Sequence, residues 1–261
     1  MRVRAPAKVN LCLRLGPLRP DGYHRVTTLV QAIDVYDELD IEPGDDTVVD
    51  GFPEDTLITA ALEALGETRR VRLEKRIPIA AGLGGGSSDA AAVLRALRGE
   101  RSPNELHEIA RAIGTDVPFF LTGAETGFCT GRGDRVHALP DFPRGHAFVV
   151  VPAGEGLSTR DVYAAAVPNP AFRAVEGELI RRMHTVRRVE HVAALMANDL
   201  EETALRMRPE VRPTLDALRA AGAVAAQVTG SGPTAFGLFP HREAAEAAAA
   251  RIPGALAASP V

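Results

Sequence analysis

The sequence predicts an α+β protein with two lobes that share a cleft. Three observations support this: strands and helices alternate in the first half, the second half is richer in helix, and a glycine-rich loop links a strand to a helix. A chain of 261 residues is long for one small domain and suits two. We expect domains over residues 1–151 and 152–261, with the junction in the segment 152–156 that contains Pro and Gly.

Strands are predicted where apolar and polar residues alternate or where a compact apolar run occurs. The predicted strands cover residues 9–15, 27–41, 71–77, 146–151, 224–229 and 234–239. The second is interrupted near Asp34, Pro78 ends the third, and Asp21-Gly22 marks a tight bend after the first.

Helices are predicted where apolar residues recur every three or four positions. The predicted helices cover residues 54–65, 89–97, 102–113, 192–206, 210–221 and 241–251. Ser102-Pro103 is a strong helix start, with Ser as the cap and Pro at the first helical position. Gly66, Gly99 and Gly114 are expected helix ends.

Composition and charge exclude several classes of protein. The net charge is −4 without blocks of like charge, which argues against a nucleic-acid-binding or membrane-binding surface. No apolar run approaches the roughly 18 residues of a membrane span, and basic residues interrupt the N-terminal segment where a signal peptide would be apolar. Cys12 and Cys129 show neither disulfide-framework nor zinc spacing. We expect a cytoplasmic protein with no nucleic-acid or membrane partner.

The strongest functional signal is the glycine-rich loop. Four of the five residues 82–86 are glycine, which allows positive φ angles and close approach of a ligand to the backbone. Free amides at the start of the next helix favour phosphate binding. The loop matches neither the Walker A nor the dinucleotide-binding pattern, and a flexible linker is the alternative. The predicted phosphate-binding residues are Pro78, Ala80, Ala81, Gly82, Leu83, Gly84, Gly85, Gly86, Ser87 and Ser88.

A second motif places Lys8 and Asn10 on one face of the first strand, because side chains two apart share a face. A solvated strand face is the alternative explanation. Lysine is rare in this chain, since only Lys8 and Lys75 occur among 30 basic residues. Lys8 is therefore expected where a compact ammonium group is required rather than any cation.

Two further segments allow two interpretations each. Asp116, in the segment 114–120, either caps a helix that begins near Pro118 or serves chemistry at that helix start. The turn between the last two predicted strands is either a simple hairpin or part of a ligand site. That turn contains Thr229, Gly230, Ser231 and Gly232.

Together, the segments 5–11, 82–88 and 229–233 resemble the three-motif signature of GHMP kinases, in the same order and over nearly the whole chain. The resemblance implies a two-lobed GHMP kinase fold with its active site in the cleft. It implies ATP and Mg²⁺ as cofactors, with no side-chain cage for the metal. It also implies that the glycine-rich loop holds the ATP phosphates, while residues 229–232 support the loop and the substrate.

Residues 19–24 and 115–118 resemble one branch of these kinases. This branch implies phosphorylation of the 2-hydroxyl of 4-diphosphocytidyl-2-C-methyl-D-erythritol, a small-molecule substrate of the non-mevalonate isoprenoid pathway. It also implies that Lys8 and Asp116 are catalytic, with Asp116 as general base or as an orienting group. Asn10 would bind the substrate or orient Lys8.

For the cytosine, the resemblance implies stacking on Tyr23 and hydrogen bonds from His24. The segment 157–163 resembles the one that supplies a second stacking aromatic, which makes Tyr163 and Thr159 further substrate-binding candidates. Ordinary half-buried tyrosines are the alternative. Cys12 and the segment 130–134 depart from the family pattern. The remaining histidines, which include His107, His137, His146 and His184, are interpreted as surface residues.

Three other functions compete with this interpretation. The nearest is another GHMP kinase that acts on homoserine, mevalonate or a sugar, none of which has a base for Tyr23 to stack on. The second is a nucleotide-binding regulator without catalysis, which would not need Lys8 and Asp116. The third is a non-enzymatic interaction module, which would leave the glycine-rich loop unexplained.

Overall fold

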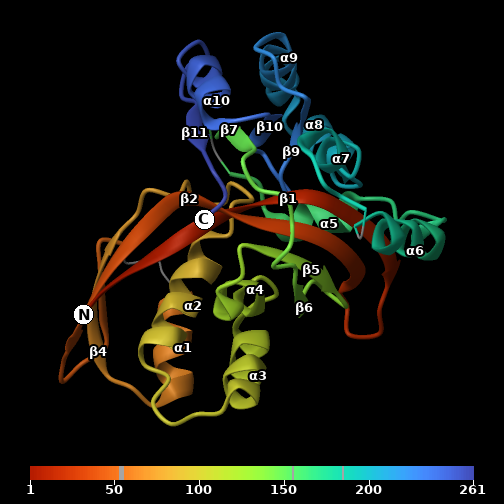
Figure 1. Ribbon diagram of the computed structural model, residues 1–261. Coiled ribbons are helices and arrows are strands. Elements are labelled where there is room, and N and C mark those ends of the chain that lie inside the picture. The colour runs from red at the N-terminus through yellow and green to blue at the C-terminus, as the bar shows by residue number, and fades with distance from the viewer. Residues whose placement is uncertain (53–55, 155, 184) are drawn as a thin grey trace.

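The computed structural model describes residues 1–52, 56–154, 156–183 and 185–261, and it confirms the α+β class (Figure 1). A seven-stranded sheet contains β1 (Arg2–Leu18), β2 (His24–Pro43), β3 (Val48–Asp50), β4 (Arg69–Glu74), β5 (Thr126–Thr130), β6 (Arg135–Ala138) and β8 (Ala197–Asn198). A four-stranded sheet contains β7 (Ala147–Val151), β9 (Ala225–Val228), β10 (Ala235–Phe239) and β11 (Leu256–Ala258), in the order β11-β7-β10-β9.

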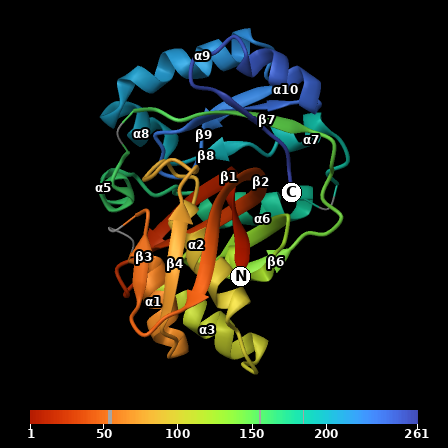
Figure 2. The same cartoon turned by 90° about the vertical axis from the view of Figure 1, so that its left-hand side faces the viewer.

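Helices cover both sheets (Figure 2). The first sheet carries α1 (Leu57–Leu65), α2 (Gly85–Ala96), α3 (Pro103–Ile113) and α4 (Val117–Thr122). The later helices are α5 (Thr159–Ala165), α6 (Phe172–Met183), α7 (Val189–Ala193), α8 (Glu201–Met207), α9 (Arg212–Ala220) and α10 (Arg242–Ala249). Among these, α6 contacts β1, while α9 and α10 cover the four-stranded sheet.

The long β1–β2 hairpin forms the centre of the molecule. Its turn at residues 19–23 includes Gly22 with φ of +82°, as the Asp-Gly pair predicts. The interruption expected near Asp34 is a bulge, because Ala7 pairs with Ile33 while Pro6 pairs with Tyr36. The strand therefore bends at this point and continues.

The two lobes share a hydrophobic core between the sheets. Leu11 and Leu29 of the first sheet belong to the same buried cluster as Phe148 and Phe236 of the second. Strand β7 precedes the expected domain junction but pairs with β10 and β11 of the second sheet. The junction remains a proposal, and this pairing favours a position before β7.

The helix predicted over residues 89–97 begins four residues earlier, at Gly85, inside the glycine-rich loop. Gly84 is the N-cap with φ of +72°, so Ser87 and Ser88 lie in the first turn and do not cap it. The strand predicted over residues 71–77 ends at Glu74. It ends early because the Asp37 carboxylate accepts hydrogen bonds from the amides beyond it, at 2.6 and 2.8 Å.

The single helix predicted over residues 192–206 is wrong. Helix α7 ends at Ala193, α8 begins at Glu201, and between them β8 pairs with β1 in parallel. The Asn198 amide explains the break, since it donates hydrogen bonds to the carbonyls of Val228 and Gly230 at 2.9 and 2.8 Å. A tertiary contact here overrides the helical spacing.

The other helix predictions are close to the observed bounds. Ser102 forms a capping box with Glu105, and Gly66 ends α1 in a left-handed conformation. The N-terminal part of the helix predicted over residues 54–65 falls on positions 54 and 55, which lie outside the described residues. His146, predicted at the surface, is buried and hydrogen-bonded to Gln31 at 2.8 Å. His184 also lies outside the described residues.

Candidate active site

Lys8 and Asn10 lie in the interior rather than on a solvated strand face. The Lys8 ammonium donates a hydrogen bond to Asn10 Oδ1 at 2.6 Å and lies 3.6 Å from Asp116 Oδ2. Only 5% of the Lys8 side chain is exposed, compared with 38% for Asp116. A buried ammonium needs such partners, because desolvation of an unpaired charge is costly.

Asp116 stands at the N-cap position of α4, but its side chain makes no capping hydrogen bond. The carboxylate instead faces Lys8, so capping does not explain this residue. Tyr163 of α5 lies in the same electrostatic environment. Burial raises the pKa of Tyr163, and the negative charge of Asp116 adds to the rise. The Asp116 carboxylate is thus paired with Lys8 on one side, and its partial exposure leaves the other side open to solvent.

The glycine-rich loop packs directly on these residues. The Leu83 carbonyl accepts a hydrogen bond from the Lys8 amide at 3.0 Å. A side chain at Gly84 would be crowded and strained, because its φ is +72° and a Cβ there would lie 3.0 Å from the Phe120 ring and 3.1 Å from carbons of the Lys8 side chain. Gly82 has φ of +77°, and its Cβ would lie 2.4 Å from the Thr229 carbonyl oxygen. The glycines are thus required by close packing as well as by backbone conformation.

The third motif completes the same cluster. The Thr229 hydroxyl accepts a hydrogen bond from the Asn10 amide at 3.0 Å. Ser231 shares a hydrogen bond with Thr159 of α5 at 2.9 Å. The segment is a hairpin between β9 and β10, and it also contacts Asn10 and the glycine-rich loop, so both interpretations hold. Residues from β1, α2, α4, α5 and the β9–β10 turn therefore meet at one place.

The start of α2 fits the phosphates of a nucleotide. The first amides of a helix lack partners within the helix and carry its positive dipole end. Ser88 lies in this turn, and its buried hydroxyl has no hydrogen-bond partner among the described residues. Ser87 lies in the same turn, and its Oγ would be 3.9 Å from a Cβ at Gly114, two residues before Asp116 in the chain. Backbone amides and hydroxyls are the donors that phosphate oxygens need.

Sequence reasoning missed an ionic cluster beneath this turn. The Lys75 ammonium lies 2.5 Å from Asp37 and 2.9 Å from Asp89, which belongs to α2. Burial alone would lower the pKa of Lys75, but the two carboxylates outweigh it and raise the pKa. A Cβ at Gly85 would lie 3.0 Å from the ammonium. The rarity of lysine was the only available signal for this residue.

The predicted cytosine-binding residues are brought only partly together. The ring centroids of His24 and Tyr163 are 6.3 Å apart, and His24 Nδ1 donates a hydrogen bond to the Gly16 carbonyl at 3.0 Å. Tyr23 extends into solvent with 48% of its surface exposed. The guanidinium carbon of Arg132 lies 5.0 Å from the centre of its ring.

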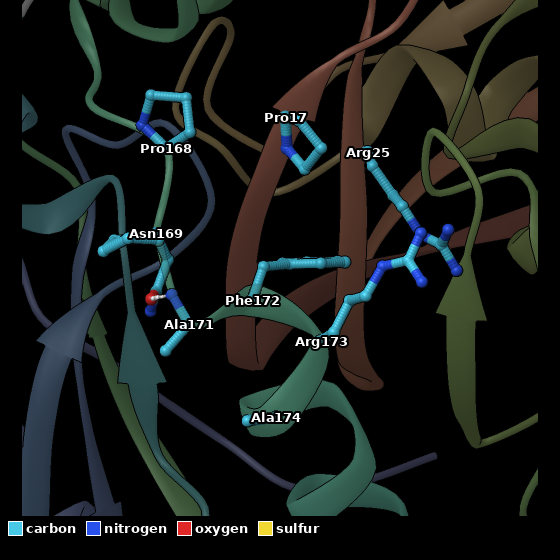
Figure 3. Close-up of a pocket in the computed structure, with 9 residues that line it drawn as sticks. Pro17, Arg25, Pro168, Asn169, Ala171, Phe172, Arg173 and Ala174 are labelled. Carbon is cyan, nitrogen blue, oxygen red and sulfur yellow. Dashed lines mark hydrogen bonds between the residues drawn. The ribbon is translucent and has the colours of Figure 1, made fainter.

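A separate cavity of about 540 Å³ lies beside the β1–β2 hairpin (Figure 3). Figure 3 shows the side chains of Arg25 and Arg173 extending toward each other along one edge. The cavity is lined by Pro17, Arg25, Pro168, Asn169, Pro170, Ala171, Phe172, Arg173 and Ala174. It contains none of the residues of the three motifs.

Within the described parts of the chain, no group of three or more His, Cys, Asp or Glu side chains is arranged to hold a metal ion. No helix among the described residues is long and apolar enough to cross a membrane.

Two family models match the chain. The model of the GHMP kinases N terminal domain matches residues 56–124, and the GHMP kinases C terminal model matches residues 177–258. The fold and the cluster of three motifs thus define a kinase of the GHMP class.

Comparison with whole proteins narrows this class. A curated 4-diphosphocytidyl-2-C-methyl-D-erythritol kinase from Salinispora tropica is 40% identical, over 97% of this chain and 87% of its own length. One from Anaeromyxobacter sp. strain K is 42% identical, over 96% and 84% respectively. The chain belongs to the 4-diphosphocytidyl-2-C-methyl-D-erythritol kinase family.

Solved structures agree with this assignment. A crystal structure of a 4-(cytidine 5'-diphospho)-2C-methyl-D-erythritol kinase is 35% identical, covers 99% of this chain and 98% of its own, and gives a TM-score of 0.78. A homoserine kinase from Cytophaga hutchinsonii covers 100% of this chain and 94% of its own at 18% identity, with a TM-score of 0.71, which shows the shared fold alone.

Proposed function

We propose that this chain transfers the γ-phosphoryl group of ATP to the 2-hydroxyl of 4-diphosphocytidyl-2-C-methyl-D-erythritol in the non-mevalonate isoprenoid pathway. The observation that carries the proposal is the meeting of Lys8, Asp116 and the glycine-rich loop at one point. Phosphoryl transfer rests on positioning and charge stabilisation, and this cluster supplies both. The family assignment selects the substrate.

In this proposal, Asp116 receives or orients the proton of the attacking hydroxyl. Its partly exposed carboxylate can reach a substrate, while Lys8 holds it from the buried side at 3.6 Å. The Lys8 ammonium also stabilises negative charge on the group in transfer. Asn10 fixes the position of Lys8 through the hydrogen bond to its side-chain oxygen.

The amides of the glycine-rich loop and the hydroxyls of Ser87 and Ser88 bind the ATP phosphates. Thr229 and Gly230 hold the loop in place by their contacts with Asn10 and Gly82. Mg²⁺ bound to the phosphates supplies neutralisation of their charge.

Tyr23, His24 and Tyr163 bind the cytosine. Because His24 donates from Nδ1 to the Gly16 carbonyl, the neutral ring has an acceptor at Nε2. An acceptor suits the exocyclic amino group of cytosine, and Tyr23 and Tyr163 offer faces for stacking, which contributes about 1–3 kcal/mol per base. Thr159, on the same helix as Tyr163, shares a hydrogen bond with Ser231 and is a further substrate-binding residue in this proposal.

We further infer that the enzyme works in the cytoplasm without a nucleic-acid partner. The buried free thiols of Cys12 and Cys129 suit a reducing compartment, and the chain carries a net charge of −4.

Phosphorus NMR of the product tests the proposed reaction. After incubation with ATP and Mg²⁺, we expect a new phosphomonoester signal coupled to carbon 2 of the erythritol unit, with the diphosphate signals of the cytidine compound retained. Phosphorylation of another hydroxyl would contradict the proposed geometry, and no new ester would contradict the proposed reaction.

A further inference from the structure

Arg132 lies in the segment 130–134. The segment forms the turn between β5 and β6, beside the tip of the β1–β2 hairpin (Figure 1). Its Gly131 carbonyl accepts a hydrogen bond from the Val26 amide at 2.8 Å, which ties the turn to the strand that carries His24.

The guanidinium group of Arg132 is held on two sides. Its Nε donates a hydrogen bond to Asp134 Oδ2 at 3.0 Å, and Nη2 donates to the Arg111 carbonyl. Asp134 is only 2% exposed, and it also accepts a hydrogen bond from Arg111 at 2.9 Å. Burial alone would raise the pKa of Asp134, but the hydrogen bonds from Arg111 and Arg132 outweigh it and lower the pKa. The carboxylate is therefore a charged and fixed anchor.

This anchored group lies over the Tyr23 ring, with its central carbon 5.0 Å from the ring centre. Tyr23 lies at the end of the β1–β2 turn, where its amide donates a hydrogen bond to Asp21 at 3.2 Å and its carbonyl accepts one from Arg19 at 2.7 Å. Its backbone is thus held, while 48% of the residue is exposed and Arg132 covers one face of the ring. A guanidinium group on an aromatic face is attractive by about 0.5–2 kcal/mol, according to exposure. A binding surface that is already ordered loses less entropy when its ligand arrives.

We propose that Arg132 is a positioning residue for substrate binding, which holds the Tyr23 ring as a preformed platform for the cytosine. This inference rests on the proposed function, because it requires the cytosine to stack on Tyr23. The planar fork of arginine is essential, since one edge binds Asp134 and Arg111 while the face covers the ring. If Arg132 instead acted by direct charge attraction to the substrate diphosphate, any cationic side chain at this position would suffice.

The test measures binding of CDP by calorimetry and the KM of both substrates for Arg132→Ala and Arg132→Lys. We expect both variants to weaken CDP binding and raise the KM of the cytidine substrate about five- to tenfold, at unchanged kcat and KM for ATP. Arg135→Ala is the matched control, because this exposed arginine lies three positions away in the same hairpin. Thermal unfolding of each variant shows whether the turn remains folded.

A double-variant cycle gives the sharper readout. In a Tyr23→Ala background, Arg132→Ala should have no further effect on CDP binding, because the platform is already absent. Full rescue by Arg132→Lys, or equal effects of Arg132→Ala with and without Tyr23, would overturn the positioning role. CDP binding by the wild type with no change in the Arg132 variants would overturn it also. Absence of CDP binding by the wild type would instead contradict the proposed function and, with it, the platform.

Discussion

Two lysines and their carboxylate partners account for much of the site at the scale of single residues. Lys8 is almost fully buried and faces a carboxylate that remains open to a substrate. Lys75 is held between two carboxylates that are themselves buried. The first pair is suited to chemistry because one partner is accessible, and the second is suited to fixing the start of α2.

Asp116→Asn should lower turnover by about 10²- to 10⁴-fold, because the amide neither accepts the proton nor pairs with Lys8. The dissociation constant of ATP should stay near the wild-type value, since the glycine-rich loop is unchanged. Steady-state kinetics and ATP calorimetry measure the two effects. Asp161→Asn, an exposed position on α5, is the control. Near-wild-type turnover of Asp116→Asn would remove this residue from the mechanism.

Lys75→Met should lower the free energy of unfolding by about 3–5 kcal/mol, because it leaves two buried carboxylates without their shared cation. Urea unfolding measures the loss. Adding Asp89→Asn should recover part of it, since one of the uncompensated charges is then gone. An unchanged midpoint in Lys75→Met, or no recovery in the double variant, would show that the cluster does not stabilise this region.

The glycine-rich loop and the third motif act as one unit at the scale of elements. The loop is joined to strand β1 by the backbone hydrogen bond from Lys8 to Leu83, and the β9–β10 turn is joined to β1 by the hydrogen bond from the Asn10 backbone amide to the Thr229 hydroxyl. Because the helix start is built into the loop, its free amides are fixed by the same packing that would crowd a side chain at Gly82 or Gly84.

Gly82→Ala should destabilise the protein by about 1–3 kcal/mol more than Gly254→Ala, and it should raise the KM for ATP. Both glycines have positive φ, +77° and +72°, but a Cβ at Gly82 meets the Thr229 carbonyl and one at Gly254 meets nothing within 4 Å. Both variants therefore carry the strain of positive φ, and only Gly82→Ala adds crowding, so the difference between them measures the crowding. Equal losses in the two variants would mean that the close approach of the loop and the third motif does not matter.

Sequence patterns predicted the elements whose alternation or helical spacing is a clear local signal, but β3, β5, β6, β8, β11, α5 and α6 were not predicted. They placed α3 and the β9–β10 hairpin close to their observed bounds, whereas β1, predicted over residues 9–15, spans Arg2–Leu18, and β2, predicted over residues 27–41, spans His24–Pro43. The predicted bounds were wrong where hydrogen bonds with residues far away in the chain replace the local backbone pattern. Asp37 takes the amides that would extend β4, and Asn198 binds the turn after β9 instead of continuing a helix.

In the candidate site, too, residues in local motifs were predicted and residues that act through long-range contacts were not. Lys8, Asp116 and the glycine-rich loop stood out through motifs, and the structure brings them together. Arg132 and Asp37 were not found, since their importance arises from contacts with residues far away in the chain.

At the scale of the whole molecule, the interface between the two sheets holds the lobes together, and His146 lies within it. His146, just before β7, donates a hydrogen bond from Nε2 to Oε1 of Gln31 on β2 and lies edge-on to Phe148. Since Gln31 Oε1 is an acceptor, the imidazole donates. Burial lowers the pKa of His146 to about 4, so the residue is neutral in the folded protein near pH 7.

This interface predicts a pH effect on stability. An unfolded histidine titrates near 6.5, so the unfolded chain binds an extra proton between about pH 6.5 and 4. The stability that His146 contributes is therefore fully present above pH 6.5 and is lost as the pH falls toward 4. The loss between pH 7.5 and pH 5 should be roughly 1–2 kcal/mol.

Urea unfolding of the wild type and His146→Gln at the two pH values measures this contribution. Glutamine does not titrate but retains an amide donor for Gln31, so the difference between the two proteins isolates the histidine from the acidic residues. An equal decline in both proteins would assign the acid sensitivity to other groups.

Release of ADP tests the central claim most directly, when ATP and Mg²⁺ are supplied with either 4-diphosphocytidyl-2-C-methyl-D-erythritol, homoserine, mevalonate or galactose. The account predicts turnover with the cytidine compound alone. Turnover with another alcohol instead would retain the fold and the phosphate loop but contradict the assigned substrate. ATP binding without turnover of any of the four would contradict a kinase role and support a catalytically silent nucleotide-binding regulator.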